Sequence, residues 1–167
     1  RTPAHYFYGR ALKGFREGME AAGLNNDEQL LLGAEATNAL EGYLAVRPLL
    51  AGPRRPTAVV AARDLFANGV CRAARENGLV LGRDLSVTGY DDLSWPLERP
   101  MLTTFREPCL ELGRKAVDLL VERLGGTRRE SVRLAIEAPL ILRRSAGPVP
   151  LEEDNRRPGV ERLGKGG

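Results

Sequence analysis

Charged residues stand directly after two apolar runs that have the character of buried β-strands. The run 57–62 leads into Arg63 and Asp64, and the run 85–90 leads into Asp91. Ligands of an open α/β sheet collect beyond the carboxyl ends of its strands. A carboxylate at such a place accepts hydrogen bonds from two adjacent donors, such as the hydroxyls of a polyol. The sequence therefore predicts one shared small-molecule pocket, with Asp91 as its polar anchor.

Each of these side chains also has a structural interpretation. An aspartate often caps the turn that follows it, which is the alternative for Asp91. Arg63 could hold an anionic group, such as a sugar acid or a phosphate, through a bidentate contact. It could equally pair with Asp64 or Asp91 and narrow the pocket. Asp64 itself is expected to cap the helix that begins there rather than to contact a ligand.

The elements that must position these residues have the order of βαβ units. Apolar residues at helical spacing predict helices over 8–22, 38–50, 64–76 and 108–124. Strands are expected at 29–32, 57–62, 85–90 and 102–106, with one or two more within 132–142. This alternation predicts a Rossmann-like α/β fold, a parallel sheet with flanking helices. Residues 1–7 lack the buried strand that normally opens such a sheet, so the chain is expected to be a piece of a larger protein.

The composition argues against several classes of protein. Charged residues make up 28% and hydrophobic residues 43%, which is ordinary for a globular domain. The net charge of +3 comes from interspersed basic and acidic residues without a basic stripe, which argues against direct nucleic-acid binding by this segment. The sequence offers no nucleophile elbow, phosphate-binding glycine loop or metal cluster, so we expect no enzyme, cofactor or metal site. No apolar run approaches the length of a membrane span.

The cysteines and the C-terminal residues complete the expectations from composition. Cys71 and Cys109 are too few and too far apart for a disulfide framework. Both fall in predicted helices, where we expect small buried hydrophobic residues of a protein in the reducing cytoplasm. Residues 147–167 are rich in Pro, Gly and charge without periodicity, which predicts a disordered tail.

Six short motifs follow one another along the chain. They are Gly14-Phe15; Pro56-Thr57-Ala58-Val59 with Asp64, Gly69 and Ala73-Ala74; Asp84 to Asp92; Leu102-Thr103-Thr104; Leu112 to Val117; and Leu142 to Ser145. In this order and at this spacing they resemble the lactose-repressor (LacI/GalR) family of bacterial transcription regulators. The resemblance covers about residues 9–146.

The resemblance implies two Rossmann-like subdomains, similar to those of periplasmic sugar-binding proteins, with an effector in the cleft between them. Residues 1–146 would form a partial effector-binding domain, mainly its C-terminal subdomain. Helix 109–124 would be the crossover helix that packs into the N-terminal subdomain. The helix-turn-helix headpiece with which the family binds operator DNA has no matching pattern in this chain.

The function that follows from the resemblance is the effector-sensing portion of a transcription regulator. Its partners would be a sugar or sugar derivative and a second copy of the chain in a homodimer, with operator DNA contacted only through a headpiece, all in the cytoplasm. The alternative is a periplasmic-type sugar- or solute-binding protein of the same fold.

The resemblance also assigns ligand-binding residues, with several departures from the family pattern. Asp91 matches the family aspartate that accepts hydrogen bonds from the ligand. Arg63 stands where related repressors commonly carry a small polar residue such as Asn. Arg10 lies one place away from the slot of the family's ligand-binding arginine, which Ala11 occupies here. Thr37 takes the slot where some members present a stacking aromatic ring.

One further departure, Glu107, stands near the hinge where a Gln is common in the family. Together the departures imply either an unusual effector, with an anionic one favoured by Arg63, or a site that is no longer used. The bound molecule is thus expected to be carbohydrate-like, neutral or anionic.

Overall fold

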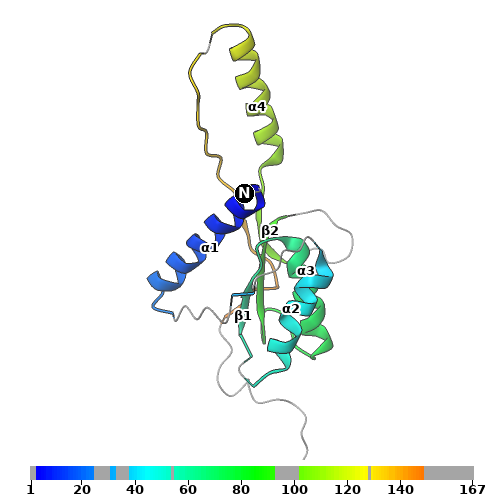
Figure 1. Cartoon of the computed structure of the whole chain (residues 1–167). Helices are drawn as coiled ribbons and strands as arrows, with labels where there is room; N and C mark the ends of the chain where they lie inside the picture. Colours follow the sequence, from blue (N-terminus) through cyan, green and yellow to red (C-terminus); the bar gives the residue numbers. More distant parts are fainter. Residues whose placement is uncertain are drawn as a thin grey trace, which may run out of the picture.

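The computed structural model describes residues 3–24, 31–32, 38–53, 55–92, 102–127 and 129–148. These residues contain four helices and four strands (Figure 1). The helices are α1 (Pro3–Ala21), α2 (Ala39–Ala51), α3 (Asp64–Glu76) and α4 (Cys109–Leu124). The strands are β1 (Ala58–Val60), β2 (Ser86–Asp91), β3 (Thr103–Arg106) and β4 (Leu140–Ile141). All four predicted helices are confirmed, as are the strands predicted at 57–62, 85–90 and 102–106.

The four strands form one sheet in the order β1-β2-β3-β4. β1 runs parallel to β2, and β2 runs parallel to β3, whereas β4 lies antiparallel to β3. Val60 is paired with Thr88, and Asp91 with Arg106. The C-terminal ends of the three parallel strands therefore point toward one edge of the sheet. This arrangement confirms the predicted Rossmann-like sheet with flanking helices.

Local residues account for two of the helix ends. Asn38 caps α2, because its side-chain oxygen accepts a hydrogen bond from the Glu41 backbone at 3.2 Å. Gly23 follows α1 with a φ of 65°, a left-handed conformation that suits glycine. The predicted cap by Asp64 is wrong. Arg63 occupies the capping position of α3 without a side-chain capping bond, and the Asp64 carboxylate accepts a hydrogen bond from β3 instead.

The hydrophobic core lies between the sheet and the pair formed by α2 and α3, which cover one of its faces (Figure 1). Its buried residues are Val46, Leu50, Ala67, Val70, Cys71, Ala73, Ala74, Leu85, Val87 and Leu102. Most of those on α3 are small, and two glycines allow the helices to approach closely. A Cβ added to Gly69 would overlap the carbonyl of Ala39, and one added to Gly42 would overlap that of Phe66.

Helix α4 stands clear of this core. It projects from the sheet, and residues 129–139 return beside it (Figure 1). None of its residues is buried. All but one of its large apolar side chains are exposed, the exception being the half-buried Leu119: the exposed ones are Leu110, Leu112, Val117, Leu120, Val121 and Leu124. The apolar face for which a partner was expected is therefore open to solvent within the described part of the chain.

One strand, β4 (Leu140–Ile141), lies within the stretch 132–142, where one or two strands were predicted. Cys109 was expected to be buried but is exposed at the first turn of α4, since that turn has no covering element among the described residues. Cys71 is buried as predicted.

Two other expectations lie mainly outside the described residues. Of the strand predicted at 29–32, only Leu31 and Leu32 are described, and they are not part of a strand. Most of the tail predicted at 147–167 is not described. In the part of the chain that is, no helix has the length and apolar character needed to cross a bilayer.

Candidate functional site

The candidate site is a charge pair where two neighbouring parallel strands end. Arg63 follows β1 at the start of α3, and Asp91 is the last residue of β2. The Arg63 Nε donates a hydrogen bond to the Asp91 Oδ2 at 3.0 Å. The Asp91 side chain is only 3% exposed, whereas that of Arg63 is 46% exposed. The two side chains expected to share a pocket therefore meet, and the ion pair with Asp91, one of the roles weighed for Arg63, is present.

Burial and neighbouring charges act on the Asp91 carboxyl in opposite directions. Burial raises its pKa above the usual range for an aspartate, and the nearby Asp64 and Glu107 carboxylates raise it further. The positive charge of Arg63 and its hydrogen bond lower the pKa and offset part of this effect. A desolvated carboxylate of this kind is stabilised by further hydrogen-bond donors, such as the hydroxyls of a ligand.

Asp64 forms a second layer behind this pair. Its side chain accepts a hydrogen bond from the Thr104 Oγ1 at 2.5 Å, and both residues are buried. Gly89 in β2 makes room for this carboxylate, since a Cβ at that position would overlap the Asp64 Oδ1. Asp64 therefore joins α3 to β3. The hydrogen bond from Thr104 was not anticipated, although the Leu-Thr-Thr motif marks the position.

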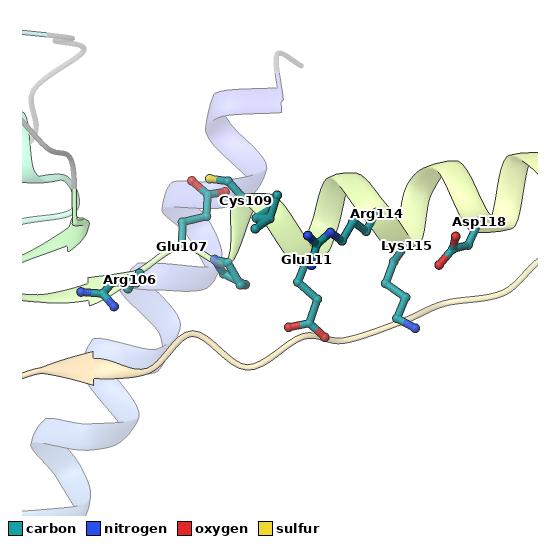
Figure 2. A pocket seen from close by; sticks show the side chains of 9 residues that line it. Arg106, Glu107, Cys109, Glu111, Arg114, Lys115 and Asp118 are labelled. Atoms are coloured by element: carbon teal, nitrogen blue, oxygen red, sulfur yellow. The ribbon is translucent and has the colours of Figure 1, made fainter.

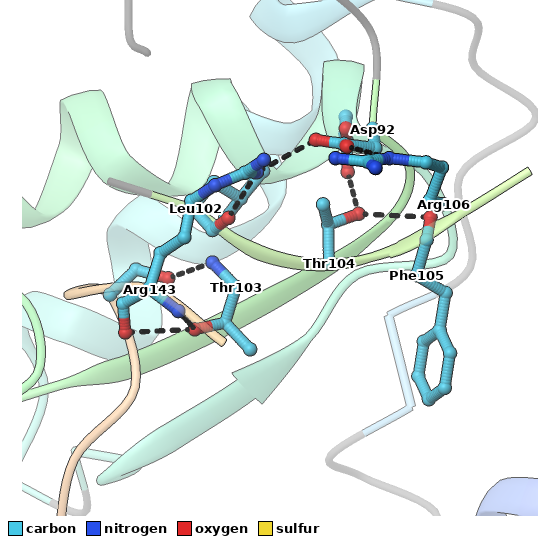
Figure 3. A network of polar contacts seen from close by, with 9 residues as sticks. Asp92, Leu102, Thr103, Thr104, Phe105, Arg106 and Arg143 are labelled. Atoms are coloured by element: carbon cyan, nitrogen blue, oxygen red, sulfur yellow. Dashed lines mark hydrogen bonds and ion pairs between the residues drawn. The ribbon is translucent and has the colours of Figure 1, made fainter. Parts of the chain in front are cut away.

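A second carboxylate follows Asp91 and is held by two arginines (Figure 3). The Asp92 Oδ2 accepts a hydrogen bond from the Arg106 Nε at 2.7 Å, and its Oδ1 lies 2.7 Å from the Arg143 Nη1. These contacts hold the pKa of Asp92 below its usual range, with the hydrogen bond from Arg143 the largest cause. The sequence indicated Asp92 only as part of a motif. Its partners come from β3 and from beyond β4, so local spacing carried no signal for them.

The remaining predicted ligand residues are not brought to this pair by any described contact. Arg10 lies exposed on α1, which stands apart from α2 and α3 (Figure 1). Thr37 lies outside the described residues. The ligand roles of Arg10 and Thr37 therefore stay predictions.

An open groove begins near the same edge of the sheet and runs along the first turns of α4 (Figure 2). It encloses about 620 Å³ and is lined by Arg106, Glu107, Pro108, Cys109, Leu110, Glu111, Arg114, Lys115 and Asp118. The lining mixes basic and acidic side chains, so it favours neither an anion nor a cation. Among the described side chains, no three His, Cys, Asp or Glu residues gather as a metal site would require.

Comparison with known proteins identifies the class of this domain. Residues 2–146 match the periplasmic binding protein-like domain family. The ribose operon repressor of Escherichia coli (strain K12) is 37% identical over 150 residues, which are 87% of this chain and 43% of the repressor. The crystal structure of a LacI-family regulatory protein from Chloroflexus aggregans superposes with a TM-score of 0.74 at 35% identity, over 81% of this chain and 49% of that protein.

A third relative carries a ligand. The crystal structure of a LacI-family transcriptional regulator from Enterococcus faecium with bound ribose has a TM-score of 0.71 and 28% identity, over 82% of this chain and 51% of that one. The chain belongs to the LacI/GalR family of transcription regulators, as part of its periplasmic-binding-protein-like effector domain. It spans less than half the length of the ribose operon repressor. That relative is a transcriptional repressor and not an enzyme, so the comparisons support the regulator over the solute-binding protein.

Proposed function

We propose that this chain is the effector-sensing portion of a LacI-type regulator and that a sugar or sugar derivative binds at Asp91 and Arg63. The observation that carries the proposal is the buried Asp91 carboxylate paired with the half-exposed Arg63 at the C-terminal ends of the parallel strands β1 and β2. The ribose bound by the regulator from Enterococcus faecium supports a carbohydrate as the ligand class.

The pair offers complementary hydrogen-bonding groups to such a ligand. Asp91 accepts hydrogen bonds from sugar hydroxyls, and its burial strengthens them because few waters compete. The contact with Asp91 uses the Nε–H of Arg63, one of the five donors of a guanidinium group. Other donors of Arg63 then reach a hydroxyl, a carboxylate or a phosphate oxygen of the ligand. Arg10 and Thr37 are proposed to complete the pocket.

Regulation would require the second subdomain, which would form the opposite wall of the effector cleft. Residues 1–146 supply one subdomain, and the exposed apolar face of α4 is proposed to pack into the other. An effector that binds one arrangement of the subdomains more tightly shifts the population toward it, and operator affinity changes by linkage. Operator binding itself is assigned to a helix-turn-helix headpiece. By analogy with the ribose operon repressor and the other LacI-family relatives, we propose a homodimer in the cytoplasm.

Calorimetric titration of the full chain tests this proposal with D-ribose, D-gluconate and D-ribose 5-phosphate as probes. Asp91→Asn keeps the side-chain shape but loses the charge, and it should weaken binding about 10- to 100-fold, the effect of a hydrogen bond to a charged group. Arg63→Ala should abolish a preference for the anionic probes. The matched control is Arg72→Ala, which removes an exposed ion pair with Glu76 on α3 and should leave binding unchanged.

Three results would contradict parts of this assignment. Equal binding of ribose by the wild type and Asp91→Asn would remove Asp91 from the site. Binding of neutral sugars that is insensitive to Arg63→Ala would keep the sensor but exclude Arg63 as an anion anchor. Binding of none of the probes by the folded chain would show that Asp91 and Arg63 do not bind these carbohydrates without the second subdomain, and would contradict the proposal for this chain.

A further inference from the structure

The chain adopts an unusual backbone conformation where β2 ends. Asp91 has a φ of 124° and Asp92 a φ of 54°, and they are the two described non-glycine residues with positive φ. Side-chain-bearing L residues seldom adopt this region, and they do so where their surroundings hold them there. Because Asp91 is the candidate ligand residue, whatever holds this turn also sets the direction of its carboxylate.

Asp92 is bound on both sides of its carboxylate. Its two carboxylate oxygens each contact a different arginine, Oδ2 the Arg106 Nε and Oδ1 the Arg143 Nη1, both at 2.7 Å (Figure 3). The Asp92 side chain is only 10% exposed, and that of Arg143 is 23% exposed, whereas that of Arg106 is 56% exposed. Arg106 is also the residue paired with Asp91 across the β2–β3 ladder. Rotation of the turn would break contacts on both sides of Asp92 at once.

The second arginine is itself fixed to the interior of the sheet. The Arg143 Nη1 donates to the Leu102 carbonyl at 3.0 Å, and the Arg143 backbone N–H donates to the Thr103 Oγ1 at 2.9 Å. Two residues on, the buried Ser145 Oγ accepts a hydrogen bond from the Thr103 backbone at 2.7 Å and donates one to the Val87 carbonyl at 2.6 Å. Arg143 thus extends from a segment bonded to both β2 and β3, which makes it a rigid support.

We propose that Asp92, gripped by Arg106 and Arg143, is a positioning residue that fixes the Asp91 carboxylate in its ligand-binding orientation. The inference rests on the proposed function of Asp91. Without the grip, the backbone relaxes toward negative φ, and the Asp91 side chain turns away from Arg63 and from the strand edge. Asp92 acts on the ligand through Asp91 and has no ligand contact of its own.

The test measures backbone conformation and ligand affinity in the same variants of the full chain. Three-bond HN–Hα couplings from NMR report φ of Asp91, and calorimetry with D-ribose reports binding. Asp92→Asn keeps the shape and tolerates a left-handed φ but removes the charge. Arg143→Gln removes one of the two arginine contacts with Asp92. Arg106→Gln removes the other contact at a largely exposed side chain, so it provides a test even if the first two variants do not fold. Each should shift the Asp91 coupling toward that of extended backbone and weaken ribose binding by about tenfold.

A matched control separates this effect from general loss of stability. Arg83→Gln removes the contact of Arg83 with Asp84 at 2.9 Å, a similar arginine–aspartate pair that does not touch the turn. It should change neither the Asp91 coupling nor ribose affinity. If the Asp92 and Arg143 variants also leave the coupling unchanged, the proposal is overturned, whatever happens to affinity. If wild-type protein does not bind ribose, the proposed function fails for that sugar, while the coupling still decides whether Asp92 positions Asp91.

Discussion

Helices α3 and α4 are both amphipathic, yet α3 is packed into the core and α4 is exposed. α3 buries seven of its thirteen residues between α2 and the sheet, whereas α4 buries none of its sixteen. The buried residues of α3 are mostly Ala, Gly and Cys, which permit close contact with neighbouring backbone. The apolar face of α4 carries Leu and Val, whose larger side chains gain more from being covered.

The difference shows that an amphipathic pattern specifies a helix but not its partner. The small residues of α3 are matched to neighbours within the same chain, as the overlap predicted for a Cβ on Gly69 demonstrates. The exposed aliphatic side chains of α4 would each gain about 1.5–3 kcal/mol on full burial, which favours coverage by another subdomain or chain. The packed half of the molecule, formed by α2, α3 and the sheet, and the α4 limb, formed by α4 with residues 129–139, should therefore respond differently to the same kinds of mutation.

The largest contrast is expected for alanine at two helical glycines. Gly69→Ala forces a methyl group into the Ala39 carbonyl and should lower the free energy of unfolding by more than about 3 kcal/mol. Gly113→Ala in α4 meets open space and should raise it by about 0.5–1 kcal/mol through helix propensity. Urea unfolding of both variants provides the measurement. Destabilisation by Gly113→Ala would show that a partner packs closely against α4.

Truncation of one valine in each region gives the next contrast. Val46 is fully buried in the core, so Val46→Ala should cost about 2 kcal/mol. Val121 is 62% exposed on α4, so Val121→Ala should change stability by less than about 0.5 kcal/mol. The comparison is made by urea unfolding over a range of protein concentrations. A cost at Val121 that grows with concentration would indicate that a second copy covers this face.

The packed half was largely predictable from the sequence, because its signals are local. Helical spacing and the apolar runs before Arg63 and Asp91 located the helices and the parallel strands. The failures arise where a residue's partner is distant in sequence. Asp64 looks like a helix cap locally, but Thr104 engages it from β3, forty residues away.

The candidate site was predictable only in part, for the same reason. The meeting of Arg63 and Asp91 follows from the rule that parallel strands end at one edge, although the sequence left open which contact Arg63 would make. The ion pair of Arg143 with Asp92 depends on a segment that follows α4 in the sequence and lies back against the sheet. No spacing rule reaches over that distance, and the exposure of Cys109 likewise depends on what does or does not cover α4.

The next contrast, between the two adjacent carboxylates at the end of β2, should appear in the pH dependence of stability. Asp92 has a lowered pKa, so its contacts with Arg106 and Arg143 stabilise the fold at neutral pH and lose this effect as the pH falls below about 4. Asp92→Asn should therefore lower the free energy of unfolding by about 1–2 kcal/mol at pH 7, and the difference from wild type should shrink as the pH falls through the lowered pKa of Asp92. Urea unfolding at several pH values measures it.

Asp91, the neighbouring carboxylate, should show the opposite dependence of stability on pH and therefore serves as the control. The raised pKa of Asp91 means that its contribution to stability is present in acid and is lost as the pH rises through its folded-state pKa. Asp91→Asn should thus not lower stability at pH 7, and any advantage over wild type should shrink toward acid pH. If both variants lose stability equally at pH 7, the distinction between a structural Asp92 and a functional Asp91 fails.

The smallest change in stability is expected at the cysteine that opens α4. Cys109 is exposed, so Cys109→Ser should alter the free energy of unfolding by less than about 0.5 kcal/mol, whereas Cys71→Ser places a hydroxyl in the core and should cost about 1–3 kcal/mol. Thiol labelling of the native protein tests the same contrast directly, since Cys109 should react at once and Cys71 only on unfolding. A Cys109 that is protected in the native protein, and becomes reactive on dilution, would mean that a second copy covers the base of α4 and that the limb is an interface.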